Sequence, residues 1–473
     1  MDSKKRKIVE WESLSKWDKV VMMVMLPIFA VVAGIEHVIA KLTGATYNEV
    51  NIIVYYLLIP LSWAAMVDYI TILFSMITLI IMNKRKKGML LFLLLITLLL
   101  VVKIIWVYCS TSNLGSFETE KKGIIRRANY LTSKVATTPQ KLLDEMPSGI
   151  GEQFQGEWAI YSCSMTCAAL ANIAILYPKN KELSIKFIGE IIDIALSEEI
   201  KEYDRMRWGE DPMDGIYGNR SHISYYSHVA WMISRYKQIG GDDKYDDTYH
   251  SLCKAMNNRI CQSPIFNAPT YPGECIYIPD MLVAIVALSN YAHQYSGKYQ
   301  STVDKWIEKA SSEWIDQETG LLASFLEEDH GKAQIALPVK GSYSALNCYY
   351  LSLVAPKFAQ EQYELLKKNF RQDFLITGLK EYHDRTCLFG MDIDAGPIIF
   401  NLSPSGTGFV IGAATSLEDM EFRKQLLKTA EIGGSTVSWF GSSHYLLANI
   451  ALVGEAIILA MRTSAPQTRM CNK

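Results

Sequence analysis

From about residue 120 onward, the chain alternates between two kinds of segment with helical periodicity. Strongly apolar segments begin near residues 157, 220, 279, 342, 405 and 442, and amphipathic, charged segments lie between them. The first four intervals between these starts are 63, 59, 63 and 63 residues. Such regular spacing indicates an internal repeat of helix hairpins.

Apolar helices of this kind need burial on nearly all sides, and this requirement limits the architecture. The apolar segments are 157–177, 220–236, 279–295, 342–353, 405–414 and 442–461. The amphipathic segments are 181–197, 244–258, 299–311, 359–370 and 417–430, and 119–133 supplies a sixth. We therefore predict an all-α fold, an (α/α)6 toroid with the apolar helices inside. The alternative is an open α-solenoid, which needs polar capping repeats, whereas the last segment here is apolar.

The composition argues against several classes of function. The net charge of the 473 residues is −2, so we expect no nucleic-acid partner. The nine cysteines include no CxxC pair, and the closest two, Cys163 and Cys167, have no histidine nearby. We therefore expect no metal site and no cofactor. One disulfide, for instance between Cys253 and Cys261, stays open.

Three apolar runs precede the repeat, at 20–40, 52–82 and 89–108, and each reaches the ~20 residues that a membrane-spanning helix needs. The segments 4–7 and 84–87 are basic, which places the tail and that turn in the cytoplasm. Everything after Tyr108 is then outside a bacterial inner or plasma membrane. The predicted domains are a basic tail (1–19), a membrane domain with three transmembrane helices (20–110), an extracytoplasmic toroid (111–465) and a short tail (466–473). Asp68, within the second run, either functions there or faces a neighbouring helix.

The long connections between hairpins are the predicted location of a site, because in a ring they all emerge at one end. The connections are 198–219, 259–278, 312–341, 371–404 and 431–441. The densest stretch, 208–228, mixes acids, imidazoles and aromatics, which suits acid/base chemistry. Its alternative is a capped surface loop. Its candidate catalytic residues are Asp214, His222 and His228, and its candidate binding residues are Trp208, Tyr217 and Tyr226.

Later connections add further candidates. Glu274 and Cys275 are candidate catalytic residues beside Tyr277, and Asp280 sits where a helix dipole favours a carboxylate. Asp392 and Asp394 form a pair that serves either acid/base chemistry or calcium binding, with Asp394 as the catalytic candidate. The last connection contributes two candidate binding residues, Trp439 and His444. Aromatic side chains at the mouth of a ring stack on sugars or enclose apolar ligands.

These features resemble the six-hairpin glycosidase superfamily and, more narrowly, the linalool dehydratase-isomerase-like membrane proteins. The narrower resemblance lies in residues 221–236, the turn 240–245 and residues 274–288. It implies a membrane domain followed by an extracytoplasmic (α/α)6 domain, with an active-site cysteine in a Cys-Glu-Pro type of loop. Here the order is Glu274-Cys275, and Asp280 stands where that family has a second cysteine.

The sequence therefore predicts a membrane-anchored extracytoplasmic enzyme that uses acid/base chemistry in the ring. The reaction is that of a lyase or isomerase, or that of a glycoside hydrolase. The partners are a small-molecule or glycan substrate and the lipid bilayer. The alternative function is a non-catalytic scaffold at the membrane that binds a glycan or a lipid.

Overall fold

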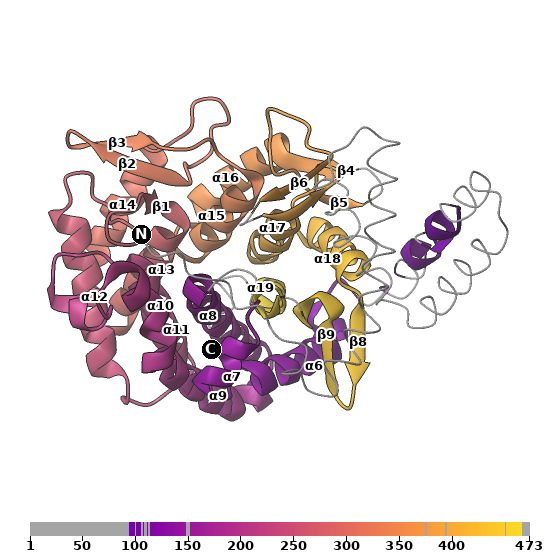
Figure 1. Cartoon of the computed structure of the whole chain (residues 1–473), viewed down its shortest axis with the longest axis horizontal. Coiled ribbons are helices and arrows are strands. Elements are labelled where there is room, and N and C mark those ends of the chain that lie inside the picture. Colours follow the sequence, from indigo (N-terminus) through magenta and orange to yellow (C-terminus); the bar gives the residue numbers. More distant parts are fainter. Residues whose placement is uncertain are drawn as a thin grey trace, which may run out of the picture.

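The computed structural model describes residues 94–99, 101–105, 107, 111, 114–147, 152–373, 376–392, 395–449 and 451–465, most of them in helices (Figure 1). The first two predicted membrane segments, 20–40 and 52–82, lie outside these residues, as does part of the third. One described helix, Phe154–Leu176, is long and apolar enough to cross a membrane, but 83% of its most apolar window is buried in the protein. Its apolarity is accounted for by the interior of the fold.

Six inner helices form a closed ring in the described part of the chain. They are α8 (Glu152–Leu176), α11 (Ile223–Gln238), α13 (Ile278–Gln294), α15 (Gly341–Val354), α17 (Pro404–Ser416) and α19 (Leu452–Thr463). Each inner helix contacts the next, and α19 packs against α8, so the ring closes. The structure therefore confirms the predicted toroid and excludes the open solenoid. Nearly every residue of α11, α13 and α15 is buried, as expected for helices that are apolar all round.

Six outer helices alternate with the inner ones along the chain. They are α6 (Phe117–Val135), α9 (Lys181–Ala195), α12 (Asp246–Gln262), α14 (Gln300–Ser312), α16 (Pro356–Phe370) and α18 (Met420–Gly434). Each buries one face and exposes charged side chains on the other, as their amphipathic sequences predict. The sixth amphipathic segment expected at 119–133 is α6. Two shorter helices, α7 (Pro139–Asp144) and α10 (Glu198–Trp208), lie beside α8.

The connections leading into the inner helices contain short strands, which the helical periodicity did not reveal. β1 (Ile276–Tyr277) pairs with β2 (Phe325–Asp329), and β2 pairs with β3 (Lys332–Ile335). Three further antiparallel hairpins are β4–β5 (Arg371–Asp373 with Thr377–Leu379), β6–β7 (Phe389–Asp392 with Gly396–Ile399) and β8–β9 (Thr436–Trp439 with Ser442–Tyr445).

The predicted start of the last inner helix at residue 442 is wrong. Residues 442–445 form strand β9, a 3-10 turn η6 follows at Leu446–Asn449, and α19 begins only at Leu452. The cause is the turn before β9, where Phe440 and Gly441 both have positive φ angles, 40° and 83°. This turn reverses the chain so that Val437 pairs with His444 across the hairpin.

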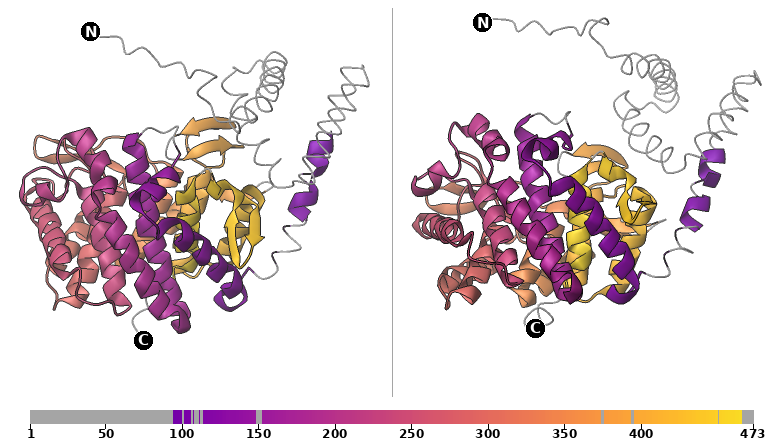
Figure 2. Two further views of the ribbon diagram at one scale, coloured as in Figure 1. Left: turned by 60° about the horizontal axis from the view of Figure 1, so that its bottom comes forward. Right: turned by 90° about the horizontal axis from the view of Figure 1, so that it is seen from below.

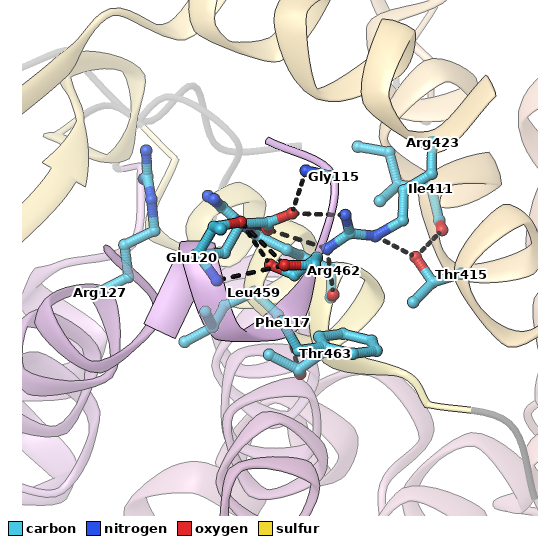
Figure 3. A network of polar contacts seen from close by, with 12 residues as sticks. Gly115, Phe117, Glu120, Arg127, Ile411, Thr415, Arg423, Leu459, Arg462 and Thr463 are labelled. Carbon is cyan, nitrogen blue, oxygen red and sulfur yellow. Dashed lines mark hydrogen bonds and ion pairs between the residues drawn. The ribbon is translucent and has the colours of Figure 1, made fainter. Parts of the chain in front are cut away.

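Buried charges join the first outer helix, α6, to the last helix hairpin, α18 and α19 (Figure 3). Glu120 of α6 accepts hydrogen bonds from Arg423 of α18 at 2.6 and 2.9 Å and from Arg462 of α19 at 2.7 Å. Arg423 also donates to Thr415 at 3.1 Å. Burial opposes the ionisation of Glu120, yet the two arginines hold its pKa below the ordinary value. The first outer helix is thus clamped to the last hairpin by a fully hydrogen-bonded ionic cluster.

Candidate functional site

The site lies at the end of the ring where the inner helices begin. Because outer and inner helices alternate, every connection from an outer helix to the next inner helix reaches this end (Figures 1 and 2). Two carboxylates stand near the start of inner helices: Glu157 in α8 and Asp280 in the first turn of α13. A helix N-terminus favours a negative charge within its first turn, where Asp280 lies, whereas Glu157 is the sixth residue of α8.

Asp280 is buried, accepts a hydrogen bond from one other inner helix and lies beside a histidine of a second. Tyr161 of α8 donates its hydroxyl to Asp280 Oδ1 at 2.5 Å, and His228 Nε2 of α11 lies 3.6 Å from the same oxygen. Ser164 Oγ is 2.8 Å from the other ring nitrogen, Nδ1, of His228. The Tyr161 and His228 rings pack with centroids 4.2 Å apart. These contacts fix Asp280 and His228 in one orientation.

Glu157 lies in the same cluster, where its surroundings favour the protonated form. Burial, followed by the negative charge of Asp280, raises the pKa of Glu157 to about 7. Tyr271 donates its hydroxyl to Glu157 Oε1 at 3.1 Å, and Arg207 Nη1 is 3.7 Å from Oε2. The Glu157 side chain is still 20% exposed, so its carboxyl group can be reached from solvent.

Charged and aromatic side chains form the exposed edge of this cluster. Arg207 of α10 donates to Glu274 at 3.0 Å, and its guanidinium lies 4.2 Å from the ring centroid of Trp208. Trp208 in turn stacks on Tyr271, with centroids 3.9 Å apart and an interplanar angle of 12°. Trp208 and Glu274, two residues predicted from the sequence, therefore lie beside Glu157.

The two histidines of the predicted stretch 208–228 belong to different clusters. His222 is fully buried and lies 2.7 Å from Asp204 through Nδ1 and 2.7 Å from Glu210 through Nε2. Burial raises the pKa of Asp204. Tyr226 is buried beneath this cluster and donates to the carbonyl of Pro212 at 2.6 Å. With both ring nitrogens engaged by protein carboxylates, His222 links α10 to the start of α11.

The remaining candidates are spread over the same end of the ring. Asp214 is exposed in the 3-10 turn η5 (Asp214–Tyr217), where Tyr217 is also exposed. Cys275 is exposed, next to Glu274. Tyr277 packs against Phe325 and Tyr343 at 4.9 and 5.5 Å between centroids.

Three described candidates, Asp392, Trp439 and His444, come from the last two connections. Asp392 accepts a hydrogen bond from Lys340 at 2.6 Å, and Asp394 lies outside the described residues. Trp439 is exposed on the β8–β9 hairpin. His444 stacks on Tyr130 at 4.0 Å, and burial lowers its pKa. Among the residues with described contacts, none of these three candidates contacts Glu157 or Asp280.

Sequence reasoning placed Asp280 at a helix start without a role in the site, and it missed five further residues of the cluster: Glu157, Tyr161, Ser164, Arg207 and Tyr271. The sequence does contain a pattern that could have identified Glu157. Like Asp280, it is a single carboxylate near the start of an otherwise apolar segment. Tyr161 lies four residues further, on the same helix face. Arg207 and Tyr271 have no comparable sequence signal, because they reach Glu157 from separate connections.

The described residues contain no group of three or more His, Cys, Asp or Glu side chains arranged to hold a metal ion. The seven described cysteines are free, so Cys253 and Cys261 form no disulfide with each other. Cys253 is buried and Cys261 is exposed.

Fold and cluster together define the class of this protein: an all-α ring of six helix hairpins with two carboxylates at the end where the inner helices begin. No known family's sequence profile matches the chain, and no curated protein sequence matches it. Among solved structures, it is similar to an unsaturated glucuronyl hydrolase specific for heparin, with 11% identity, a TM-score of 0.44, and coverage of 64% of this chain and 85% of the other.

Two further matches are an unsaturated glucuronyl hydrolase from Streptococcus agalactiae and a family 76 glycoside hydrolase from Bacteroides thetaiotaomicron. Their identities are 12% and 10%, and their TM-scores are 0.41 and 0.36. Each alignment covers 63% of this chain. It covers 80% of the glucuronyl hydrolase and 68% of the family 76 glycoside hydrolase. These three matched structures are hydrolases. The narrower resemblance, to linalool dehydratase-isomerase-like proteins, stays a prediction.

Proposed function

We propose that this protein is an enzyme that cleaves a carbon–oxygen bond by general acid/base catalysis, with a glycan as substrate. The observation that carries this proposal is the pair Glu157 and Asp280. The pKa of Glu157 is raised to about 7, whereas Asp280 accepts a 2.5 Å hydrogen bond from Tyr161. Two carboxylates in unlike environments are the arrangement by which one site supplies both an acid and a base.

In the proposed reaction, protonated Glu157 donates its proton to the leaving oxygen as the bond breaks. Asp280 acts as the carboxylate partner, which in hydrolysis removes a proton from the attacking water or stabilises the positive charge on the sugar ring. Tyr161 and His228 orient Asp280, since both contact its Oδ1. A lyase or isomerase would use the same pair, with the base removing a proton from carbon in place of water.

The edge of the cluster supports a glycan substrate. Trp208 stacked on Tyr271 offers an aromatic surface beside Glu157, and aromatic faces bind the apolar faces of sugars. Arg207 and Glu274 provide charged hydrogen-bonding groups at this edge, and Glu274 positions Arg207. Cys275 is exposed next to Glu274, so a substrate at the edge is able to meet its thiol.

We also propose that the ring is extracytoplasmic and anchored in a membrane. The support comes from the three apolar runs and the basic segments 4–7 and 84–87. The described part of the third run, in the helix Leu94–Ile105, exposes apolar side chains such as Leu98 and Val102. Side chains of this kind suit contact with lipid.

The activity is tested with the purified full-length protein and a panel of end-labelled oligosaccharides, some neutral and some containing uronic acid. We expect Glu157→Gln and Asp280→Asn each to lower kcat by about 10²- to 10⁴-fold, the usual contribution of an acid or base. The matched control is Glu361→Gln, at an exposed position on α16, which should keep full activity.

Full activity in a folded Glu157→Gln variant would contradict the proposal. Tight glycan binding without any bond cleavage would favour the scaffold alternative. Elimination products in place of hydrolysis products would assign the same pair of carboxylates to a lyase.

A further inference from the structure

Large apolar side chains on the surface of the ring gather at one of its two ends. Outside the helix Leu94–Ile105, eleven large hydrophobic residues are exposed in the described part of the chain. Ten of these eleven lie in connections that lead into inner helices, and the exception is Leu183 at the start of outer helix α9. The apolar end is therefore the end that holds the candidate site.

Of these residues, Tyr217 in η5 is 85% exposed, and three of the other most exposed lie on or beside hairpins. Phe440 is 94% exposed and Trp439 is 71% exposed, and their rings contact each other at 5.1 Å in the turn between β8 and β9. Leu388 and Met391 are at least half exposed around β6–β7. A large apolar side chain left in water forgoes the favourable free energy of its transfer out of water. Several such residues in the connections that lead into inner helices indicate a surface that is covered in the working protein.

The apolar helix Leu94–Ile105 is tied to the same end of the ring. Lys103 Nζ donates to Ser435 Oγ at 2.5 Å, and Ser435 lies between the end of α18 and the start of β8. Both views of Figure 2 show this helix on the flank of the ring that holds β8 and β9. If this helix enters a bilayer, the bilayer surface therefore lies near the β8–β9 hairpin.

From this arrangement we infer that the site end of the ring is a docking surface for a lipid bilayer, with Trp439 and Phe440 inserted into the headgroup region. The inference rests on the proposed membrane anchor, and it adds an orientation of the ring to that anchor. Aromatic side chains such as Trp439 are favoured at the interface between headgroups and acyl chains. Docking in this orientation places Glu157 and Asp280 at the bilayer surface.

The test uses the full-length protein reconstituted in lipid vesicles. The photoreactive residue p-benzoylphenylalanine takes the place of Phe440 in one variant, Leu183 in a second and Leu98 in a third. All three positions are exposed, so folding should be unaffected, and an unchanged thermal unfolding curve verifies this. After illumination, mass spectrometry measures how much lipid is attached at each position.

We expect several-fold more lipid attached at position 440 than at 183, together with lipid at position 98. Lipid at 98 with none at 440 would overturn the docking surface while leaving the anchor in place. No lipid at 98 would overturn the anchor itself. A protein adduct at 440 in place of lipid would show that a second protein covers this surface, and would likewise overturn the inference.

Discussion

At the scale of single residues, the neighbours of a carboxylate decide what it can do. Glu157 and Asp280 both stand near the start of an inner helix. Glu157 is buried beside the negative charge of Asp280. Both effects raise the pKa of Glu157 and favour its neutral form. Asp280 is held by the Tyr161 hydroxyl and lies beside His228. Two chemically similar groups thus stand in unlike surroundings, which is the basis of the proposed division of roles between them.

Cysteine reactivity gives a prediction at this scale. Cys275 and Cys261 are exposed, so a thiol reagent should modify both in the native protein. Cys163 and Cys348 should stay unmodified, because burial raises their thiol pKa and excludes the reagent. Peptide mapping after brief labelling measures this. Labelling of Cys275 should lower activity if the thiol borders the substrate, and a Cys261→Ser background removes the other cysteine that is exposed among the described residues.

Rapid labelling of Cys163 or Cys348 would contradict the buried packing of the inner helices. Full activity after complete labelling of Cys275 would remove this thiol from the proposed site.

The histidines show why the sequence predicted only part of the site. His222 is the N-cap of α11 and His228 lies six residues further on in the helix, so at ~100° per residue their side chains point ~120° apart. They therefore face different clusters, one around Asp204 and one around Asp280. Their closeness in sequence suggested a shared role, but the direction of each side chain depends on where the helix begins.

At the scale of helices and strands, periodicity predicted the inner and outer helices well because burial is what creates the pattern. The short strands escaped prediction for the same reason. A strand of two to five residues in a connection is half exposed and has no room for a repeating pattern. The β8–β9 hairpin depends on a turn with a positive φ angle at Phe440, and phenylalanine is not a residue type that predicts such an angle.

The clamp that joins α6 to the last hairpin gives a prediction for stability. Glu120→Gln removes the charge that pairs with Arg423 and Arg462 and should lower the free energy of unfolding by ~3 kcal/mol, the usual result of breaking a buried ion pair. The matched control, Glu118→Gln, lies in the same first turn of α6 but is exposed, and should change stability by less than ~0.5 kcal/mol.

The pH dependence of this difference follows from the lowered pKa of Glu120. The stabilisation is fully present above the pKa of the unfolded chain, 4.5, and is lost as pH falls through the lower pKa of the folded protein. Unfolding curves for wild type and Glu120→Gln should therefore be far apart at neutral pH and converge in strong acid. Equal stability at neutral pH would show that the cluster does not hold the ring closed.

At the scale of the whole molecule, the ring was predictable because six apolar and six amphipathic helices have few other ways to be buried. Contacts between α19 and α8 settle its closure. The site was less predictable, because its residues come from α8, α10, α11, α13 and the connection before α13. Only folding brings Arg207 to Glu274 and Tyr271 to Glu157.

The proposed topology can be measured without a substrate. A reporter that works only in the cytoplasm should be inactive when fused after Lys473 and active when fused at Lys86, because the basic segment 84–87 stays inside. An active reporter after Lys473 would contradict the extracytoplasmic placement of the ring.

The protonation state of Glu157 tests the central claim most directly. Infrared spectra of wild type and Glu157→Gln, recorded over a pH series, isolate the carboxyl band of this one residue by difference. We expect a protonated-carboxyl band present in wild type alone, disappearing with a midpoint at about pH 7. A band already lost near pH 4.5, the ordinary pKa of glutamate, would show that Glu157 is ionised at neutral pH and cannot act there as the proton donor.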